Sequence, residues 1–384
     1  MFMRFSEILG HDSQKKALLA SVASGRIPHA QLFVGPEGCG VLPMALAYAQ
    51  HVFCGGDGSA GADGDAGCHL RCDQLAHPDL HFVYPTTTNS RVKSKPTSTA
   101  YLEEWRAFIK EQPYGSMFDW YQHLGVENKQ GQIGVADAQE LTATLSLKSY
   151  EGGWKGVVIW GADKLNIAAA NKLLKLVEEP PEKTLILLVA NQEERVLETL
   201  RSRCQKTAFS PLPTQTIASG LVSKGCPKEI AEHLAHQANG SFNLALSLLR
   251  NTDAPFEDWF VRWVRTAFKA RGNKAAVLEL MAWSEQVAGT GRETQKQFLG
   301  YCLEMFRQAL LTNYGLEELT RFVSKGGFEL NRFAPFVHNG NIFLIIKALE
   351  DSFFHVERNG NAKMIFSELS LALTKLIHIK EKAA

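Results

Sequence analysis

The sequence lacks long apolar runs, a net charge of either sign and an even set of cysteines. No run approaches the ~20 apolar residues of a membrane-spanning helix, and no signal-peptide core opens the chain, so we expect a cytoplasmic protein without membrane contact. The 41 Lys and Arg residues nearly cancel the 40 Asp and Glu residues, which excludes an overall basic field for nucleic acid. Seven unevenly spaced cysteines argue against a disulfide framework.

Length and composition predict a globular protein of two or three domains. A chain of 384 residues is too long for one ordinary core, and its 45% apolar and 21% charged residues are typical of soluble proteins. From Phe256 onward the sequence is almost wholly helical in pattern, with apolar stripes and no catalytic constellation. We interpret this half as an assembly surface.

A glycine-rich turn between a buried strand and a helix dominates the N-terminal half. This layout is that of a phosphate-binding loop, G-x-x-x-x-G-K-[ST], and Gly35, Gly38 and Gly40 fit it. Val41 stands where the lysine for the phosphates would be, and Leu42 replaces the hydroxyl that holds magnesium. We interpret the region as a nucleotide-binding fold that has lost its nucleotide chemistry. The alternative is a chance glycine turn.

The α/β pattern resumes further along the chain. Gly156–Trp160 and Thr184–Ala190 are predicted buried strands, and Ala168–Glu178 is a predicted helix, which together fit a right-handed parallel crossover. In working ATPases the first such strand ends in acidic residues that hold magnesium. Here Trp160 and Gly161 occupy those positions, so a second catalytic site is empty.

A predicted helix over Glu193–Leu200 ends next to Arg203, which Ser202 and Cys204 flank. An arginine at a helix end is usually a solvated charge. The alternative is an arginine finger, a guanidinium that reaches the γ-phosphate held by another subunit.

Three cysteines and a histidine lie between the loop helix and the next predicted strand. Cys54, Cys68, His69 and Cys72 could form a tetrahedral zinc site. The Gly/Ala/Asp-rich run over residues 55–67 reads as a flexible loop. The spacing of Cys68 and Cys72 is looser than the usual C-x-x-C, and the alternative is a set of reduced surface cysteines.

Further helices are predicted from apolar periodicity. Tyr101–Gln122 reads as one aromatic helix, whose aromatic side chains we expect to pack rather than to bind a ligand. The other predicted helices cover residues 13–24, 133–147, 216–223, 228–238, 241–250, 259–270, 275–287, 292–314, 316–322, 342–359 and 363–382.

With these motifs in view, the chain resembles the delta-prime subunits of bacterial DNA polymerase III clamp loaders, which are AAA+ proteins. The resemblance covers roughly residues 4–210, and the C-terminal half matches by size and helical character only. Five phrases carry it: Phe5–Gly10, Pro28–Gly40, His77-Pro78-Asp79, Asn171–Pro181 and Ser202-Arg203-Cys204.

The resemblance implies the architecture and the function. It implies an α/β AAA+ domain over residues 1–210 with a cysteine-containing insert at 54–72, a small helical lid over 211–252 and an all-α collar over 253–384. The chain would help load the sliding clamp onto primed DNA, with gamma/tau and delta subunits as partners. It would not hydrolyse ATP, and Arg203 would complete the ATP site of a neighbouring subunit.

The resemblance also bears on the cofactors. The family carries a four-cysteine zinc module, and Cys54 and Cys72 match its ends, whereas Ala66 and His69 fall at its middle cysteines. Asn243 stands where active relatives carry a second nucleotide-sensing arginine. We therefore expect no ATP binding by this chain. The mismatch argues against the family's zinc module and leaves a shifted site of Cys54, Cys68, His69 and Cys72 as the alternative.

Three rival readings stay open. An active gamma/tau-type ATPase is opposed by Val41 and Leu42. A zinc-dependent nucleic-acid-binding module centred on residues 54–72 is opposed by the near-zero net charge. The third is a scaffold whose Arg203 is only solvated.

Overall fold

The chain folds as two compact units, Met1–Arg250 and Asn251–Ala384. The computed structural model describes residues 4–55, 66–126, 129, 131–250, 256–316, 327–358 and 360–380. The predicted helix over 316–322 and most of the predicted loop over 55–67 lie outside the described residues. No described helix is both long and apolar enough to cross a membrane.

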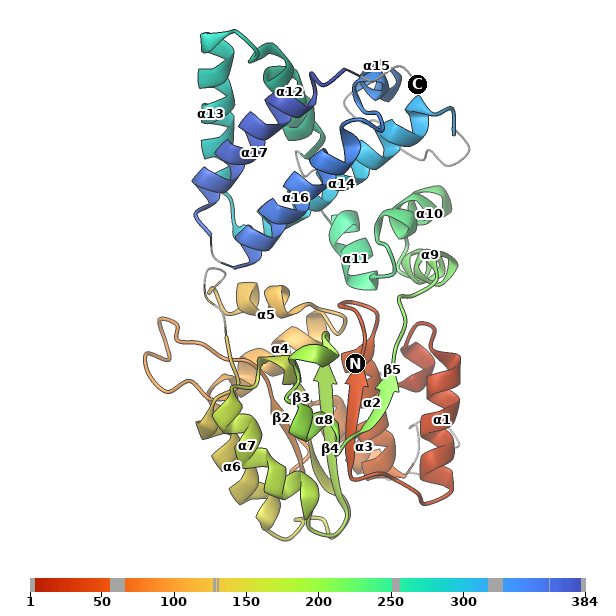
Figure 1. Cartoon of the computed structure of the whole chain (residues 1–384). Helices are drawn as coiled ribbons and strands as arrows, with labels where there is room; N and C mark the ends of the chain where they lie inside the picture. Colours follow the sequence, from red (N-terminus) through yellow and green to blue (C-terminus); the bar gives the residue numbers. More distant parts are fainter. Residues whose placement is uncertain are drawn as a thin grey trace. The chain divides into compact units, whose positions relative to one another are not determined.

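The first unit is built on a five-stranded parallel sheet with the order β2-β3-β4-β1-β5 (Figure 1). Both neighbours of β1 come late in the chain, because β1 pairs with β4 on one side and β5 on the other. This confirms the predicted α/β class. The strands are β1 (Ala30–Val34), β2 (Leu80–Val83), β3 (Lys155–Trp160), β4 (Thr184–Ala190) and β5 (Gln205–Ala208).

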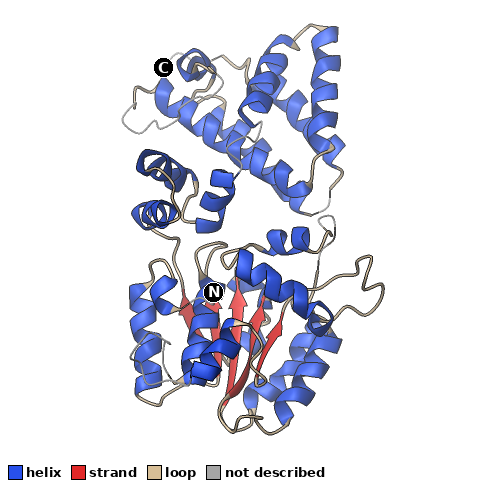
Figure 2. Ribbon diagram, turned by 180° about the vertical axis from the view of Figure 1, so that it is seen from behind, coloured by secondary structure: helices blue, strands red, loops and turns tan. Residues whose placement is uncertain are grey.

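Helices cover both faces of this sheet (Figure 2). Side chains that alternate along each strand feed two separate cores, as the two-residue period of a strand requires. Val157 and Ile159 of β3 pack towards α6 (Val135–Ser146) and α7 (Ile167–Glu178). Val158 and Trp160 belong to the opposite core. That core includes side chains from α1 (Asp12–Ala23), α2 (Val41–Cys54), α3 (Ala66–Asp73), α4 (Leu102–Glu111) and α5 (Met117–His123).

Two predicted helices are wrong in extent. The single helix over 101–122 is broken into α4 and α5, and Pro113 and Gly115 lie in the break. The helix over 193–200 is a 3-10 turn followed by α8 (Glu198–Arg201), because Val196 takes an extended conformation and is buried. The aromatic side chains pack as expected: Trp105 and Trp120 are fully buried, with ring centroids 5.7 Å apart.

A small helical lid completes the first unit. We use this name for α9 (Thr214–Ser223), α10 (Lys228–Gln237) and α11 (Phe242–Arg250). The lid shares the core that contains α2, because Ile217 and Phe242 are buried in that cluster. The lid therefore packs against the loop side of the sheet.

The second unit is all-α. Its core contains Trp263 and Trp283, whose rings stack with centroids 5.3 Å apart. The indole of Trp263 donates to Ser370 Oγ at 2.9 Å, so this polar atom is satisfied inside the core. The helices are α12 (Phe256–Lys269), α13 (Lys274–Ala288), α14 (Arg292–Asn313), α15 (Leu330–Phe333), α16 (Ile342–Glu357) and α17 (Ala362–Leu376).

Candidate functional site

The phosphate-type loop joins β1, inside the sheet, to α2. Gly38 and Gly40 have φ values of +77° and +106°, a region that favours glycine, so the chain can make this turn. Val41 and Leu42 point into the core and are 5% and 4% exposed. Side chains at these two positions stabilise packing and do not face a ligand.

The space beside the loop is almost filled. A cavity of about 20 Å³ remains, which is room for about one water molecule. Ligand pockets in proteins usually measure about 300–1,000 Å³, so this cavity is far smaller than an ordinary ligand pocket. The cavity is lined by Pro36, Glu37, Gly38, Gly40, Val41, Leu42, Pro43, Pro113, Tyr114, Gly115, Trp160, Val189 and Asn191.

The filling comes from residues 113–119, the break between α4 and α5 and the start of α5, which we call the plug. The Tyr114 hydroxyl accepts a hydrogen bond from the Leu9 N–H at 2.9 Å. The Met117 N–H donates to Glu37 Oε1 in the loop at 2.9 Å. Burial of Tyr114, which is 5% exposed, raises its pKa to about 12, so the phenol stays protonated at neutral pH.

The lid closes over the same loop. The Phe242 N–H at the start of α11 donates to the Gly38 carbonyl at 2.9 Å. A Cβ on Gly38 would lie 2.1 Å from Ser241 Oγ, so only glycine permits this approach. Asn243 Nδ2 donates to Asp119 Oδ2 of the plug at 2.8 Å.

The strand end beside the loop carries no acidic group into the cavity. Asp163 lies beyond β3, where it accepts a hydrogen bond from the Asn191 N–H at 3.4 Å and pairs with Lys164 at 3.4 Å. Its side chain is 4% exposed, and it links the turns that follow β3 and β4. Trp160 and Asn191 line the cavity instead.

Arg203 lies just beyond α8 and away from this cavity lining. Its Nε donates to Glu178 Oε1 at 2.6 Å, and its Nη1 donates to the Thr199 carbonyl at 2.9 Å. Nη2 makes no hydrogen bond to a described residue, and the side chain is 40% exposed. The guanidinium is thus held at two nitrogens while the third remains available.

The two residues that flank Arg203 have structural contacts. Ser202 Oγ lies 3.4 Å from the Thr199 carbonyl and from Arg203 Nη1. Cys204 packs against the core beside α6 and α7, and burial raises the pKa of its thiol to about 12. Such a thiol is a poor nucleophile at neutral pH.

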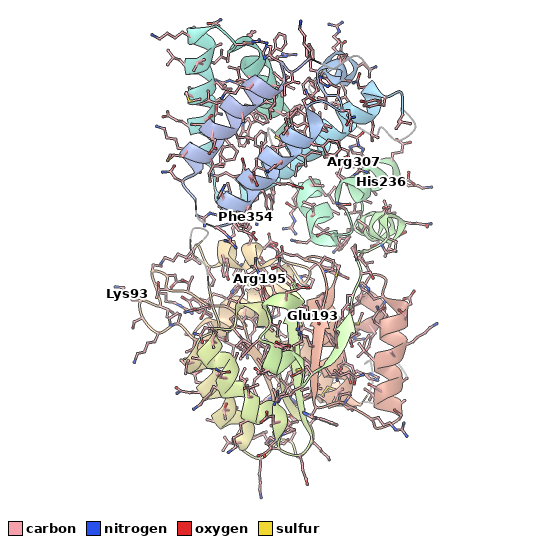
Figure 3. All side chains as sticks on the ribbon, in the orientation of Figure 1. Lys93, Glu193, Arg195, His236, Arg307 and Phe354 are labelled. Carbon is pink, nitrogen blue, oxygen red and sulfur yellow. A yellow bond between two sulfur atoms is a disulfide. The ribbon has the colours of Figure 1, made fainter. Side chains whose placement is uncertain are left out.

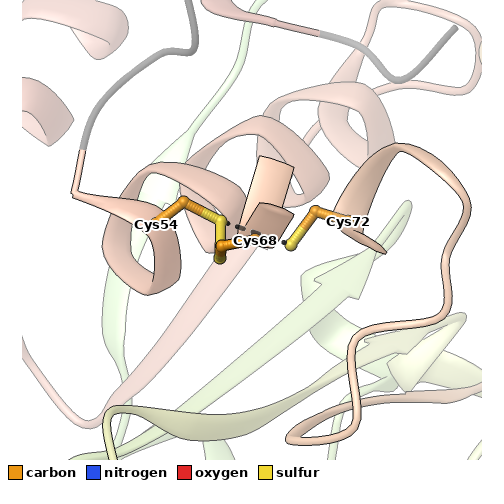
Figure 4. A group of neighbouring side chains, drawn as sticks. All are labelled: Cys54, Cys68 and Cys72. Carbon is orange, nitrogen blue, oxygen red and sulfur yellow. Dashed lines mark hydrogen bonds between the residues drawn. A yellow bond between two sulfur atoms is a disulfide. The ribbon is translucent and has the colours of Figure 1, made fainter. Parts of the chain in front are cut away.

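Three of the four predicted metal ligands lie together (Figure 4). The sulfur atoms of Cys54, Cys68 and Cys72 lie within 4.8 Å of one another, and all three residues are buried. His69 lies outside this group. Cys68 and Cys72 are one helical turn apart in α3 and share a face, whereas a residue next to Cys68 faces another side.

Two features of the cysteines differ from the prediction. Cys54 and Cys68 form a disulfide, and Cys72 Sγ lies 3.6 Å from Cys54 Sγ. They are also core residues and not surface residues. In a tetrahedral zinc site with Zn–S bonds of about 2.3 Å the sulfur ligands lie about 3.8 Å apart. The Cys54–Cys72 separation is close to this value, whereas the bonded sulfur atoms of Cys54 and Cys68 would have to be reduced and move apart.

The sequence prediction missed the plug. Its residues have no metal-binding or catalytic pattern, and Tyr114 reaches Leu9 from a distance of 105 residues along the chain. One local signal was present. Ser116 and Asp119 form a capping box that starts α5, and together with Pro113 it could have shown that the aromatic helix is broken.

The fold and the site define a class: a parallel α/β protein with a loop of the phosphate-binding type, beside which the space is almost filled. A family model described as "DNA polymerase III, delta subunit" matches residues 10–213, more than half of the chain. The chain belongs to this family.

The similar proteins agree with this assignment. DNA polymerase III subunit delta′ of Bacillus subtilis is 30% identical over 238 residues, 62% of this chain and 59% of that protein. The delta′ subunit of Escherichia coli is 41% identical over 220 residues, 57% and 53% of the two chains. A gamma/tau subunit of Mycobacterium tuberculosis is 27% identical over 225 residues, 59% of this chain and 32% of that protein. The chain spans little more than half the length of these delta′ relatives.

Proposed function

We propose that this chain is a non-hydrolysing subunit of the DNA polymerase III clamp loader. In this role it helps partner ATPases of the gamma/tau type, together with a delta subunit, to open the sliding clamp and place it on primed DNA. The observation that carries the proposal is the closed loop: a family member whose Val41 and Leu42 are core residues and whose nucleotide position is filled. A subunit without a nucleotide site contributes to such a machine through its surfaces.

Arg203 is the residue that we propose acts at a neighbour's ATP. Three observations support this role: Arg203 lies outside its own loop cavity, it is 40% exposed, and Nη2 is free of described partners. A planar guanidinium can reach a γ-phosphate with its remaining N–H donors and stabilise the charge that develops there.

The test is ATP hydrolysis by a loader reconstituted with its gamma/tau and delta partners. Arg203→Ala should slow turnover at the site that receives Arg203 by about 10³- to 10⁵-fold. In a single-turnover experiment, the fraction of bound ATP that this site hydrolyses quickly (the fast fraction) should disappear, while the other ATP sites of the loader keep their rate. Arg203→Lys keeps the charge but loses the planar fork, so it should lose most of that fraction too.

Arg195→Ala is the matched control, because Arg195 is also an exposed arginine and belongs to the turn before α8 (Figure 3). It should leave the fast fraction unchanged. Size-exclusion chromatography must show equal assembly of all variants. An unchanged fast fraction in a fully assembled Arg203→Ala loader would refute the arginine-finger role and leave a scaffold.

The second unit is the assembly surface in this proposal. Its α16 and α17 expose large apolar side chains, including Phe343 (71%), Leu344 (50%) and Met364 (70%). A groove of about 760 Å³ is lined by Leu344, Asn361, Lys363, Met364, Ser367, Glu368, Leu371, Ala372, Lys375 and Leu376. Met364→Glu should weaken assembly with the partners without unfolding the chain; full assembly of a Leu344→Glu/Met364→Glu variant would exclude this groove.

Zinc at the cysteine cluster is a separate proposal. Cys54, Cys68 and Cys72 would supply three thiolate ligands, and zinc would tie the end of α2 to α3. Protein purified under reducing conditions should contain about one zinc per chain, and Cys72→Ser should lose it. Metal-free reduced protein with unchanged thermal stability would contradict the proposal.

A further inference from the structure

The lid contacts the plug at the two residues with which α11 begins. Asn243 Nδ2 donates to Asp119 Oδ2 at 2.8 Å. The ring of Phe242 meets the ring of Tyr114 edge to face, with centroids 5.1 Å apart. Both side chains of this aromatic pair are buried. One end of the lid is thus bound by a polar contact and an aromatic contact.

Asp119 is held firmly enough to act as a fixed acceptor. The same oxygen that receives the Asn243 amide also accepts the Ser116 N–H at 2.7 Å and the Ser116 hydroxyl at 2.6 Å. The bond from the Ser116 N–H is half of the capping box of α5, so the carboxylate is positioned by a helix that packs in the core.

The plug also contacts the two segments on which the lid rests. The Tyr114 hydroxyl accepts the Leu9 N–H. The Leu9 side chain packs against Gly220 of α9, where a Cβ on Gly220 would lie 2.6 Å from Leu9 Cδ1. The Met117 N–H donates to Glu37 of the loop. The carbonyl of the neighbouring Gly38 accepts the Phe242 N–H at the start of α11. The plug, the loop and the lid therefore form one connected set of contacts.

We propose that the plug takes the place of a nucleotide as the group that holds the lid against the loop. A nucleotide bound between a phosphate loop and a lid would couple the two only while it is present. The plug is part of the chain, so its effective concentration is fixed and the lid stays closed in every nucleotide condition. The inference uses contacts within the first unit alone and does not depend on Arg203 or on any partner.

Hydrogen exchange of the full-length chain tests this directly. In a Tyr114→Ala/Asn243→Ala variant the amides of α9 to α11 should exchange at least about tenfold faster. The variant loses the Asn243–Asp119 hydrogen bond, the Tyr114–Phe242 ring pair and the Tyr114–Leu9 hydrogen bond, which all oppose opening. The amides of α6 and of the second unit should keep their wild-type rates. Millimolar Mg²⁺–ATP should leave the exchange of the wild-type lid unchanged.

Tyr121→Phe is the matched control. It removes a buried hydroxyl of α5 that donates at 3.3 Å to the carbonyl of Gly131, a residue outside the lid. Lid exchange in this variant should match the wild type. If the double variant fails to fold, Asn243→Ala alone should still speed lid exchange, by about threefold or more.

Two results would overturn the inference. One is a folded double variant whose lid exchanges at the wild-type rate, since the plug would then not hold the lid. The other is slower lid exchange of the wild type in Mg²⁺–ATP, since a nucleotide would then still act on the lid. Neither result would decide the ATPase experiment, because that experiment tests Arg203 in the reconstituted loader and not the lid of the isolated chain.

Discussion

The phosphate-type loop and the end of α8 are two places where the sequence motifs indicate nucleotide chemistry, and their side chains differ in burial. At the loop, the catalytic residue types are replaced by buried Val41 and Leu42, and the plug fills the remaining space. At α8, Arg203 keeps a 40% exposed guanidinium with light restraint from Glu178. The difference shows that a loop of the phosphate-binding type can keep its shape while side chains fill the space beside it. In the proposed role, Arg203 must instead stay at the surface to reach a neighbour.

The largest expected effect comes from an attempt to restore the loop with Val41→Lys/Leu42→Thr. A lysine at a position that is 5% exposed places an unpaired charge in the core, so the variant should lose about 2–4 kcal/mol of stability. Thermal unfolding of the first unit and calorimetric titration with Mg²⁺–ATP measure this. No ATP binding is expected, because the plug is unchanged.

The control for this variant is Leu147→Lys, since Leu147 is 67% exposed and its replacement should change stability by less than about 0.5 kcal/mol. If the Val41→Lys/Leu42→Thr variant has wild-type stability and binds ATP stoichiometrically, the contrast between a filled loop and an exposed Arg203 is wrong. The loop would then be an intact site that lacks only two side chains.

An intermediate effect is expected from alkaline pH. Burial raises the pKa of Tyr114 from 10.0 to about 12, so below pH 10 its phenol is protonated in both the folded and the unfolded chain. Between about pH 10 and pH 12 only the unfolded chain releases this proton, and the stability that Tyr114 contributes falls by up to about 2–3 kcal/mol.

Tyr114→Phe isolates this effect. Other buried tyrosines titrate in both proteins, so the measured quantity is the difference between the two curves of unfolding free energy against pH. The curve of Tyr114→Phe should fall less steeply above pH 10. Parallel curves would mean that the phenol is not buried and that the plug does not fill the loop.

The smallest effect is expected at the Arg203 side. Glu178→Gln removes an ion pair whose side chains are 45% and 40% exposed, so stability should change by less than about 1 kcal/mol. A double-mutant cycle with Arg203→Ala should give a coupling of about 0.2–1 kcal/mol that weakens as salt is added. Glu179→Gln, at the adjacent exposed position, is the matched control. If molar salt leaves the coupling free energy unchanged, the Arg203–Glu178 pair is shielded from solvent and is not the exposed ion pair described here.

Local pattern was enough to predict most of the α/β unit. The strand over Thr184–Ala190 has the predicted bounds, and α7 begins one residue earlier than predicted, because continuous apolar runs and a 3.6-residue period encode these elements directly. The α1 cap is an exception. The helix predicted to start at residue 13 begins at Asp12, and His11 holds the N-cap position with φ +58°.

The candidate site was predicted only in part. Missing residue types at Val41 and Leu42 can be read from spacing, and so can the exposed Arg203, because each belongs to a short motif. The plug could not be read in this way. The Asn243–Asp119 contact joins residues 124 positions apart, and neither residue type indicates the other. Such contacts follow from how helices pack on the sheet, which periodicity does not specify.

The order of the strands has a consequence for synthesis of the chain. β1 is made early, but its partners β4 and β5 lie more than 150 residues later in sequence. Both edges of β1 stay unpaired until β4 has emerged, and one edge stays unpaired until residue 208 has emerged, a state that promotes wrong pairing. Contacts this distant also make folding slow. The first unit therefore becomes foldable only when more than half of the chain has left the ribosome.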